Sequence, residues 1–428
     1  SSVTRVQTCA LPIYMDAPRL RNLKKQNDMQ EPEIQVGLLS NEEICFTLHG
    51  KFHVVTPMGD PVPSMKIADG TQHALLENGQ IVWNGERFNG LLFFPVEDPE
   101  NNYFELKDVM IGKHFHWQQN ENQCFQGTLR LIIEDNVMTA INIINTERYL
   151  TSVIASEMSA TASLELLKAH AVISRSWLLA QLTLQPSDAY QECGHRDDKE
   201  IVRWYNRSAH QHYDVCADDH CQRYQGISKV TTEVAKQAVE QTCGEILIYN
   251  GTICDTRFSK CCGGVTELFS TCWEDKDYPY LTDVIDPYCG MADQHILSQV
   301  MVDYDQQTTN FYRWTVTYTQ QELHNLLQTN TGIDFGDIID LEPLARGTSG
   351  RIFRLKIVGS LRTLIIGKEL EIRKTLSKSH LFSSAFTIEK QGEETLPSAF
   401  VLHGAGWGHG VGLCQIGAAV MGEKGFKY

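Results

Sequence analysis

The 428-residue sequence lacks any apolar run long enough to form a membrane-spanning helix. It also lacks a cluster of lysines and arginines, and its formal net charge is −16. An acidic chain without a basic patch is poorly suited to bind nucleic acid or an anionic membrane surface. Repeats and low-complexity runs are absent too, while 42% of the residues are hydrophobic. The chain is therefore expected to be globular, with enough core for two or three domains.

The arrangement of apolar residues predicts an α+β fold. Short alternating runs divided by Gly, Asn, Asp and Pro indicate a β-rich N-terminal region at 33–145. A pair of helices follows at 147–182, and strands with one helix at 320–328 make residues 301–400 a β-rich insertion. The expected core of the protein spans 146–300, and a Gly-rich motif occupies 401–428.

Each helix of the central pair carries one charged side chain on its apolar face. In the first helix, Glu157 shares a face with Val153 and Ile154, and in the second helix Arg175 lies in the apolar stripe. Burial raises the pKa of a carboxyl group, so a glutamic acid in such a place can hold a proton and act as a general acid. The alternative is a structural ion pair between Glu157 and Arg175 that pins the helices together.

Cysteines are concentrated in one part of the sequence. Of 13 in total, nine lie between positions 193 and 289, which favours local disulfides or a metal site. The densest group is Cys216 and Cys221 with histidines at 210, 212 and 220, and such ligands suit zinc. A disulfide between Cys216 and Cys221 is the alternative. Disulfides would imply an oxidising compartment outside the cytoplasm.

The central segment resembles the signature of a known family. That pattern is Tyr-Leu, a short apolar run, Glu-Met, and then Leu-Lys-Ala-Gln-Ala-Val-Ala-Ala-Arg-Thr-Tyr. Residues 149–177 match it and keep its Glu and Arg as Glu157 and Arg175, while its Gln is His170 and its Thr-Tyr is Ser176-Trp177. The chain thus resembles the SpoIID/LytB family, named after stage II sporulation protein D and the LytB amidase enhancer.

The C-terminal motif at 403–421 is similar to the family's Gly-x-Gly-His-Gly-x-Gly-Met-Ser-Gln-x-Gly-Ala. Its glycines let backbone amides face a ligand. It has neither the Lys-Ser/Thr of a P-loop nor the strand–helix context of a Rossmann turn, so it is not a nucleotide loop. His409 stands between two glycines with little to pack on, which favours a role in orienting a substrate or Glu157 over a core role. The family's Ser is Cys414 here.

Two shorter elements extend the resemblance. A Gln-x-Tyr-x-Gly element follows the cysteine–histidine group, and some SpoIID-like proteins bind zinc through one His and two Cys at the matching place. A Gly-Gly-x-Thr loop resembles a substrate-side loop, although Cys261 and Cys262 stand before its glycines where the family is Ser-rich. The implied substrate-binding residues are Gln222, Tyr224, Gly263, Gly264, Thr266, Gly408, Gly410 and Gln415.

The resemblance implies a protein that acts on peptidoglycan. The expected activity is lytic transglycosylation of glycan strands stripped of their stem peptides, with Glu157 as acid and base and with Arg175 and His409 orienting Glu157 or the sugar. No cofactor is expected for catalysis. One structural zinc is expected, held by His210, Cys216 and Cys221. One alternative is a non-catalytic, glycan-binding enhancer of a partner amidase. A zinc amidase or peptidase is disfavoured, because thiolate-rich sites are usually structural and no His-Glu-x-x-His is present.

Compartment and chain ends are predicted as well. The wall substrate and the cysteine group favour export to the cell envelope, in sporulation or general wall remodelling. Residues 1–13 resemble a translated sequencing adapter, and 14–32 are polar, as in a linker. We therefore expect that a signal peptide was lost from this sequence and that the C-terminal motif is truncated at Tyr428.

Overall fold

The computed structural model describes residues 4–6, 31–62, 67–96, 101–111, 119–183, 193–205, 210–301 and 310–428. The chain forms two compact units. The N-terminal unit comprises Val6–Thr183 and Ala209–Ile246, and the C-terminal unit comprises Ser1–Arg5, Leu184–Ser208 and Leu247–Tyr428. The expected α+β class is confirmed, with more strand (42%) than helix (24%).

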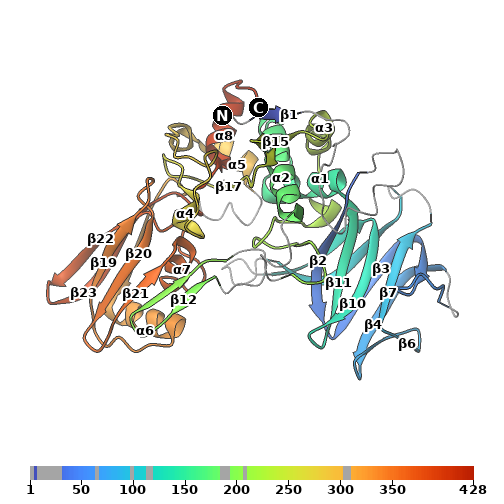
Figure 1. Cartoon of the computed structure of the whole chain (residues 1–428), viewed down its shortest axis with the longest axis horizontal. Helices are drawn as coiled ribbons and strands as arrows, with labels where there is room; N and C mark the ends of the chain where they lie inside the picture. Colours follow the sequence, from blue (N-terminus) through green and yellow to red (C-terminus); the bar gives the residue numbers. More distant parts are fainter. Residues whose placement is uncertain are drawn as a thin grey trace. The chain divides into compact units, whose positions relative to one another are not determined.

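One large, mainly antiparallel sheet makes up most of the N-terminal unit (Figure 1). Its strands follow the order β14-β2-β11-β10-β7-β3-β4-β5-β6, and β8 pairs with β3 and β9. Alternation of apolar and polar residues buries one face, as at Ile34 and Val36 of β2. The strands are β2 (Glu33–Asn41), β3 (Glu43–Val55), β4 (Ile67–Glu77), β5 (Gln80–Trp83), β6 (Glu86–Phe88), β7 (Gly90–Pro95), β8 (Tyr103–Ile111), β9 (Gln119–Gln126), β10 (Thr128–Glu134), β11 (Val137–Asn145) and β14 (Val215–Cys216).

A tight hairpin sets the register that leads into the central helices. Asp135 and Asn136 both adopt positive φ (48° and 60°), and they link β10 to β11 with Glu134 opposite Val137. Two-residue turns of this kind favour Asn and Asp because these residues tolerate the left-handed region. The hairpin therefore fixes the register of β11 against β10.

The predicted helical pair is confirmed as α1 (Thr146–Glu157) and α2 (Leu164–Thr183). The α1 helix starts directly after β11 and buries Leu150, Val153 and Ile154. Ser163 caps α2, since its hydroxyl accepts a hydrogen bond from the Leu166 N–H (3.4 Å). Two further elements complete this unit, η4 (Gly226–Lys229) and α3 (Glu233–Gln241).

The C-terminal unit contains a five-stranded sheet, β12-β13-β21-β20-β19, and a three-stranded sheet, β18-β23-β22. They share a core with α6 that includes Leu323, Leu327, Leu355 and Phe400. The predicted helix at 320–328 is confirmed as α6 and extends to Thr331. The elements are β12 (Gly194–Arg196), β13 (Glu200–Arg203), β18 (Arg313–Thr319), α6 (Gln320–Thr331), β19 (Ile338–Arg346), β20 (Ile352–Gly359), β21 (Thr363–Gly367), α7 (Glu369–Thr375), β22 (Phe386–Glu393) and β23 (Leu396–Ala405).

Shorter elements of the C-terminal unit bring two distant motifs together. β17 pairs in parallel with β24, so Phe258 lies opposite Leu413 and Ser259 opposite Cys414. The Cys-Cys-Gly-Gly loop after β17 is therefore a neighbour of the Gly-rich motif. The remaining elements are β1 (Thr4–Val6), β15 (Ile246–Tyr249), β16 (Thr252–Ile253), β17 (Phe258–Ser259), α4 (Phe269–Cys272), η5 (Tyr288–Met291), α5 (Gln294–Val300), β24 (Leu413–Cys414) and α8 (Gln415–Glu423).

These units differ from the predicted domains. The expected core at 146–300 is divided at Ile246, and residues 310–400 share one unit with the Gly-rich motif. The reason is pairing between distant segments, such as β13 with β21, which a linear reading does not detect. Most of the predicted scar and linker lies outside the described residues.

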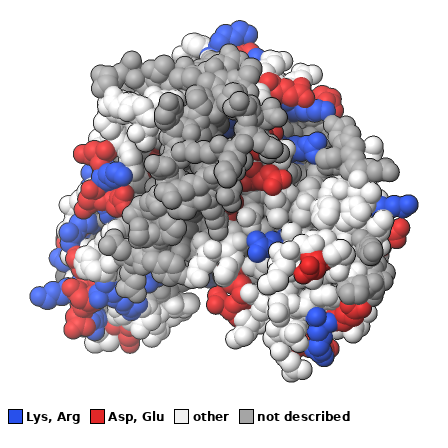
Figure 2. Space-filling model, turned by 45° about the vertical axis from the view of Figure 1, so that its right-hand side comes forward, with Lys and Arg blue, Asp and Glu red and all other residues white. Residues whose placement is uncertain are grey.

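Surface charge and helix length bear on whether the protein binds nucleic acid or spans a membrane. Figure 2 shows one face, on which the described lysines and arginines are scattered among aspartates and glutamates. Within the described ranges, no helix is long and apolar enough to cross a membrane.

Candidate functional site

Glu157 is the last residue of α1, and its side chain is nearly buried (8% exposed). Its Oε1 accepts a hydrogen bond from the Arg223 backbone N–H (2.9 Å). Two serines of the same helix bind the next part of that segment: Ser156 Oγ accepts from the Gln225 N–H, and Ser152 Oγ donates to the Gly226 carbonyl. The segment at 222–226 is therefore fixed along α1, and it positions a donor on the Glu157 carboxyl.

Arg175 does not have the partner that the sequence suggested. Its Nε and Nη2 bind Glu147 Oε1 and Oε2 (2.8 and 2.5 Å), and its Nη1 donates to the Glu245 carbonyl (3.1 Å). Glu147 lies in the first turn of α1, whereas Glu157 ends the helix about 15 Å further along the axis. The alternative of a structural ion pair between Glu157 and Arg175 is therefore not what the structure shows, and Arg175 instead joins α2 to the start of α1. An orienting role for Arg175 stays a prediction.

Gln222 and Tyr224, predicted to contact substrate, lie in the core. Tyr224 stacks on Tyr149 (ring centroids 5.0 Å apart) and donates to Asn142 Oδ1 (2.5 Å). Gln222 accepts from the Tyr149 hydroxyl and donates to the carbonyl of Ser174. Both side chains are buried and hydrogen-bonded within the protein. Their geometry supports a role in holding the segment beside Glu157. It does not support direct contact with a substrate.

The predicted zinc ligands converge, and a fourth group joins them. Ligand atoms of His210, Cys216, His220 and Cys221 all lie within 4.8 Å of one another. Cys221 Sγ is 3.4 Å from His210 Nε2 and 3.6 Å from His220 Nδ1, and Cys216 Sγ is 4.0 Å from His220 Nδ1. His212 instead approaches Glu134 (3.9 Å). Of the two other histidines in this stretch, His220 joins the group with His210, and His212 does not.

These distances fit one tetrahedral zinc ion. Bonds of about 2.3 Å to sulfur and about 2.0–2.1 Å to nitrogen place tetrahedral S and N ligands roughly 3.5 Å apart. Neither Cys216 nor Cys221 forms a disulfide in this structure. Two thiolates and two imidazoles are a common structural zinc set. The ligands present therefore fit the expected ion, which would brace the segment that leads to Arg223.

The pKa of the buried Tyr149 is affected both by this ligand group and by Glu157. Burial is the largest cause that raises the pKa of Tyr149 well above its usual value, and the charges of Cys221, Cys216 and Glu157 add to it. A small pocket of about 60 Å³ is lined by residues that include Cys216, Arg223 and Tyr224. Ligand pockets usually measure about 300–1,000 Å³, so this space is too small for a glycan.

In the C-terminal unit, a buried arginine shapes the Gly-rich motif. Arg351 donates from Nε and Nη2 to the Gly408 carbonyl (3.1 and 3.0 Å) and from Nη1 to the Cys262 carbonyl (3.1 Å). A Cβ at Gly410, whose φ is +76°, would lie 2.5 Å from the guanidinium carbon. Gly408 and Gly410 are therefore needed for backbone shape and for the close approach of Arg351.

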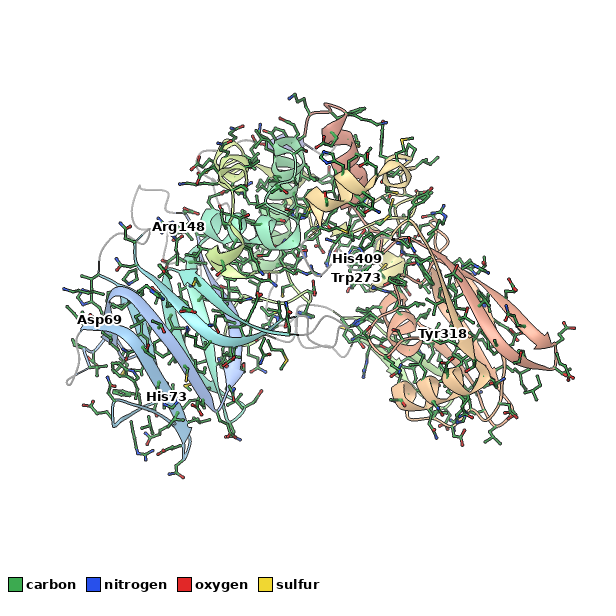
Figure 3. The ribbon with its side chains drawn as sticks, turned by 180° about the vertical axis from the view of Figure 1, so that it is seen from behind. Asp69, His73, Arg148, Trp273, Tyr318 and His409 are labelled. Atoms are coloured by element: carbon green, nitrogen blue, oxygen red, sulfur yellow. The ribbon has the colours of Figure 1, made fainter. Side chains whose placement is uncertain are left out.

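His409 is held as a neutral imidazole. Its Nδ1 accepts a hydrogen bond from the Val411 N–H (3.0 Å), and its ring meets Trp273 edge to face (4.9 Å; Figure 3). Burial, followed by the charges of Arg257 and other arginines, keeps its pKa well below the usual value. Glu157 belongs to the other unit, so the orienting role of His409 stays a prediction.

The other predicted substrate residues serve the shape of the same loops. Thr266 Oγ1 accepts from the Val284 N–H (2.7 Å) and donates to the Thr282 carbonyl. Gln415 is buried at the start of α8. Gly263 and Gly264 adopt positive φ (86° and 117°), as the paired glycines allow. Contact of these residues with a substrate stays a prediction.

Sequence reasoning assigned no role to Glu267, which is fully buried. Its Oε1 accepts from Leu268, Thr271 and Thr348, and its Oε2 accepts from the Ser349 N–H and hydroxyl. Ser349 Oγ in turn accepts from Arg351. An acidic residue directly after the Gly-Gly-x-Thr loop was the available signal, but its partners at 348–351 are distant in sequence.

Comparison with protein families identifies the class of this structure. Residues 134–249 match the family described as stage II sporulation protein, SpoIID. This region holds α1, α2, Glu157 and the ligands at 210–221, and it ends within three residues of the boundary between the units. Residues 267–412 match DUF8618, a domain of unknown function. The chain thus carries a SpoIID domain, and the resemblance found in the sequence is confirmed.

Individual relatives agree with this class. The chain is 25% identical over 281 residues to stage II sporulation protein D of Bacillus subtilis, covering 65% of this chain and 69% of that protein. It is 25% identical to the amidase enhancer of the same organism, covering 65% of this chain and 38% of the relative. An uncharacterized protein of Brachyspira hyodysenteriae is 28% identical over 70% of this chain and 67% of its own length.

Proposed function

We propose that this protein is a lytic transglycosylase that cleaves peptidoglycan glycan strands and that Glu157 carries the chemistry. The observation that supports this role is the placement of Glu157. Its carboxyl is nearly buried at the end of a helix, and one oxygen is held by a backbone N–H. A single oriented carboxyl in a poorly solvated place suits general acid and base catalysis.

One carboxyl is sufficient for the proposed reaction. Protonated Glu157 donates its proton to the glycosidic oxygen between N-acetylmuramic acid and N-acetylglucosamine, and the C1–O bond breaks. The resulting carboxylate accepts the proton of the muramoyl C6 hydroxyl while that oxygen bonds to C1. The product has a 1,6-anhydro end, and the proton returns to Glu157. No water attacks, so the second carboxylate of ordinary glycosidases is not required.

The zinc group supports this site from outside the reaction. His210, Cys216, His220 and Cys221 supply four protein ligands, and a site with four protein ligands leaves no open position for a substrate. The ion would polarise and stabilise its own ligands. The Glu157 carboxyl is positioned by the protein, because the loop that holds the zinc ligands also carries the Arg223 N–H that binds it. This closed set argues against the zinc amidase or peptidase alternative.

A second candidate is a non-catalytic enhancer that binds glycan and stimulates a cell-wall amidase. The similarity to the amidase enhancer of Bacillus subtilis favours it. The similarities to sporulation proteins make the cell envelope the proposed location for either function.

The test compares Glu157→Gln with Glu165→Gln. Glutamine keeps the shape of Glu157 and removes its titratable proton. Because acid–base catalysis contributes about 10²–10⁴-fold, formation of 1,6-anhydro ends from denuded strands should fall by that factor. Glu165 lies in the first turn of α2 and pairs with Lys168, so its variant should retain turnover. Mass spectrometry of the products and thermal unfolding of each variant provide the readouts.

Three outcomes decide between the candidates. Reducing ends in place of anhydro ends would show a hydrolase. Wild-type protein that forms neither product yet stimulates an amidase as well as Glu157→Gln would establish the enhancer. Loss of folding in Glu157→Gln would assign Glu157 a structural role.

A further inference from the structure

A second group of metal-ligating side chains lies in the C-terminal unit. Ligand atoms of Cys262, Asp286, Cys289 and Cys414 are all within 4.8 Å of one another. They come from three segments: the loop after β17, the start of η5, and the N-cap of α8. The three cysteines are buried and are free thiols in this structure.

Their spacing is that of ligands around one ion. Cys262 Sγ lies 3.6 Å from Cys289 Sγ and 3.4 Å from Asp286 Oδ2. Tetrahedral zinc with bonds of about 2.3 Å to sulfur and about 2.0–2.2 Å to oxygen places two sulfurs roughly 3.8 Å apart and a sulfur and an oxygen roughly 3.6 Å apart. A disulfide needs about 2.05 Å between its sulfurs. The observed arrangement is closer to the metal geometry.

The surroundings orient these ligands. The Cys262 N–H points to Cys414 Sγ (3.2 Å), and the Gly264 N–H points to Cys262 Sγ (3.4 Å). Asp286 Oδ1 accepts from the N–H groups of Tyr288 (2.9 Å) and Cys289 (3.4 Å), which leaves Oδ2 directed at the thiols. Such hydrogen bonds to ligand atoms are typical of built metal sites.

A glycine makes room for the carboxylate. A Cβ at Gly417 would lie 2.1 Å from Asp286 Oδ2, so any other residue on this turn of α8 would displace it. Cys262 stands where the family that this chain resembles is Ser-rich, and Cys414 replaces that family's Ser in the Gly-rich motif. The two substituted residues lie next to each other in the structure, which indicates that they serve one role together.

We propose that Cys262, Asp286, Cys289 and Cys414 bind one zinc ion, separate from the ion held at 210–221. The ion has a structural role, because four protein ligands close its coordination. It joins α8 and η5 to the loop after β17. That loop is bound to the Gly-rich motif through the Cys261 N–H and the Trp407 carbonyl (3.1 Å) and through Arg351, which contacts both Cys262 and Gly408. The ion thereby fixes the backbone that presents His409.

The first measurement is the zinc content of folded, full-length protein purified without chelator. Mercurial titration of the thiols with a zinc-sensitive dye should release about two zinc ions per chain. Cys289→Ser should release about one, and so should the double variant Cys216→Ser/Cys221→Ser. Cys254→Ser is the matched control, because Cys254 is a buried thiol of the same unit outside the ligand group, and it should release two.

A cobalt measurement covers the case in which Cys289→Ser does not fold. The double variant Cys216→Ser/Cys221→Ser, loaded with Co²⁺, keeps the three thiolates of the proposed site and lacks both thiolates of the group at 210–221. It should show a sulfur-to-cobalt charge-transfer band, and its Cys254→Ser derivative should show the same band. The proposal is overturned if the wild type releases one zinc and the double variant none. It is also overturned if folded, metal-free protein contains a Cys262–Cys289 disulfide. Neither measurement depends on turnover. A failure of this zinc proposal can therefore be distinguished from a failure of the proposed catalysis.

Discussion

The two units each bury a glutamate, and they bind it differently. Glu157 in the N-terminal unit retains 8% of its surface and is held by the Arg223 N–H, whereas Glu267 in the C-terminal unit has no exposed surface. Backbone and hydroxyl donors from two loops surround both oxygens of Glu267. A carboxylate surrounded by fixed donors is suited to hold loops together, and one with remaining access is suited to exchange a proton. The difference separates a proposed reactive group from a structural one.

The largest effect on stability is expected for Glu267→Gln. The amide replaces an acceptor oxygen with a donor nitrogen, so donors from Thr348 or Ser349 would lose their partner. We expect a loss of about 3–5 kcal/mol in the free energy of unfolding, measured with urea. Glu274→Gln, at a half-exposed glutamate of the same unit, should change little. Unchanged stability in Glu267→Gln would remove the distinction between the two glutamates.

A smaller effect is expected for the zinc ligands that support the segment beside Glu157. If His220 is the fourth ligand at 210–221, His220→Ala should weaken zinc binding by at least about tenfold, measured against a chelating dye. Turnover should fall in parallel as the Arg223 N–H loses its position beside Glu157. His212→Ala is the matched control, since His212 approaches Glu134 instead. Equal loss in both variants would contradict the ligand assignment.

The smallest effect concerns His409 in the C-terminal unit. Its pKa is depressed in the folded protein, whereas an unfolded histidine has a pKa near 6.5. The unfolded chain therefore binds this proton first, and stability is lost as the pH falls below about 6.5. Because the unfolded histidine is already half protonated at pH 6.5, wild-type protein should lose up to about 1 kcal/mol more than His409→Gln between pH 6.5 and 5.5. Urea titrations of both proteins at both pH values provide the measurement. A flat wild-type profile would refute the effect.

Local patterns predicted the helices and the first ligand group well. The spacing of Leu150, Val153 and Ile154 determined the face of α1, and Glu157 lies on it as expected. His210, Cys216 and Cys221 are close in sequence, so loop geometry alone brings them near one another. In both cases the informative residues are within about a dozen positions of each other.

Pairings between distant residues escaped the sequence analysis. The partner of Arg175 depends on how α2 is rotated and shifted against α1, and spacing along one helix does not specify this. Gln222 and Tyr224 belong to a recognisable element, but their burial depends on the sheet and on Tyr149. Cys262 and Cys414 are 152 residues apart in the sequence, and the pairing of β17 with β24 brings them together.

The parallel pairing of β17 with β24 also bears on the order in which the chain can fold. The N-terminal unit contains no residue beyond Ile246, whereas the loop after β17 cannot complete its contacts without Leu413 and Cys414. The thiols of Cys261 and Cys262, which are buried in the folded protein, are therefore uncovered until residues 413–414 pair with β17. That interval is the one in which a chaperone or a metal donor has most to contribute.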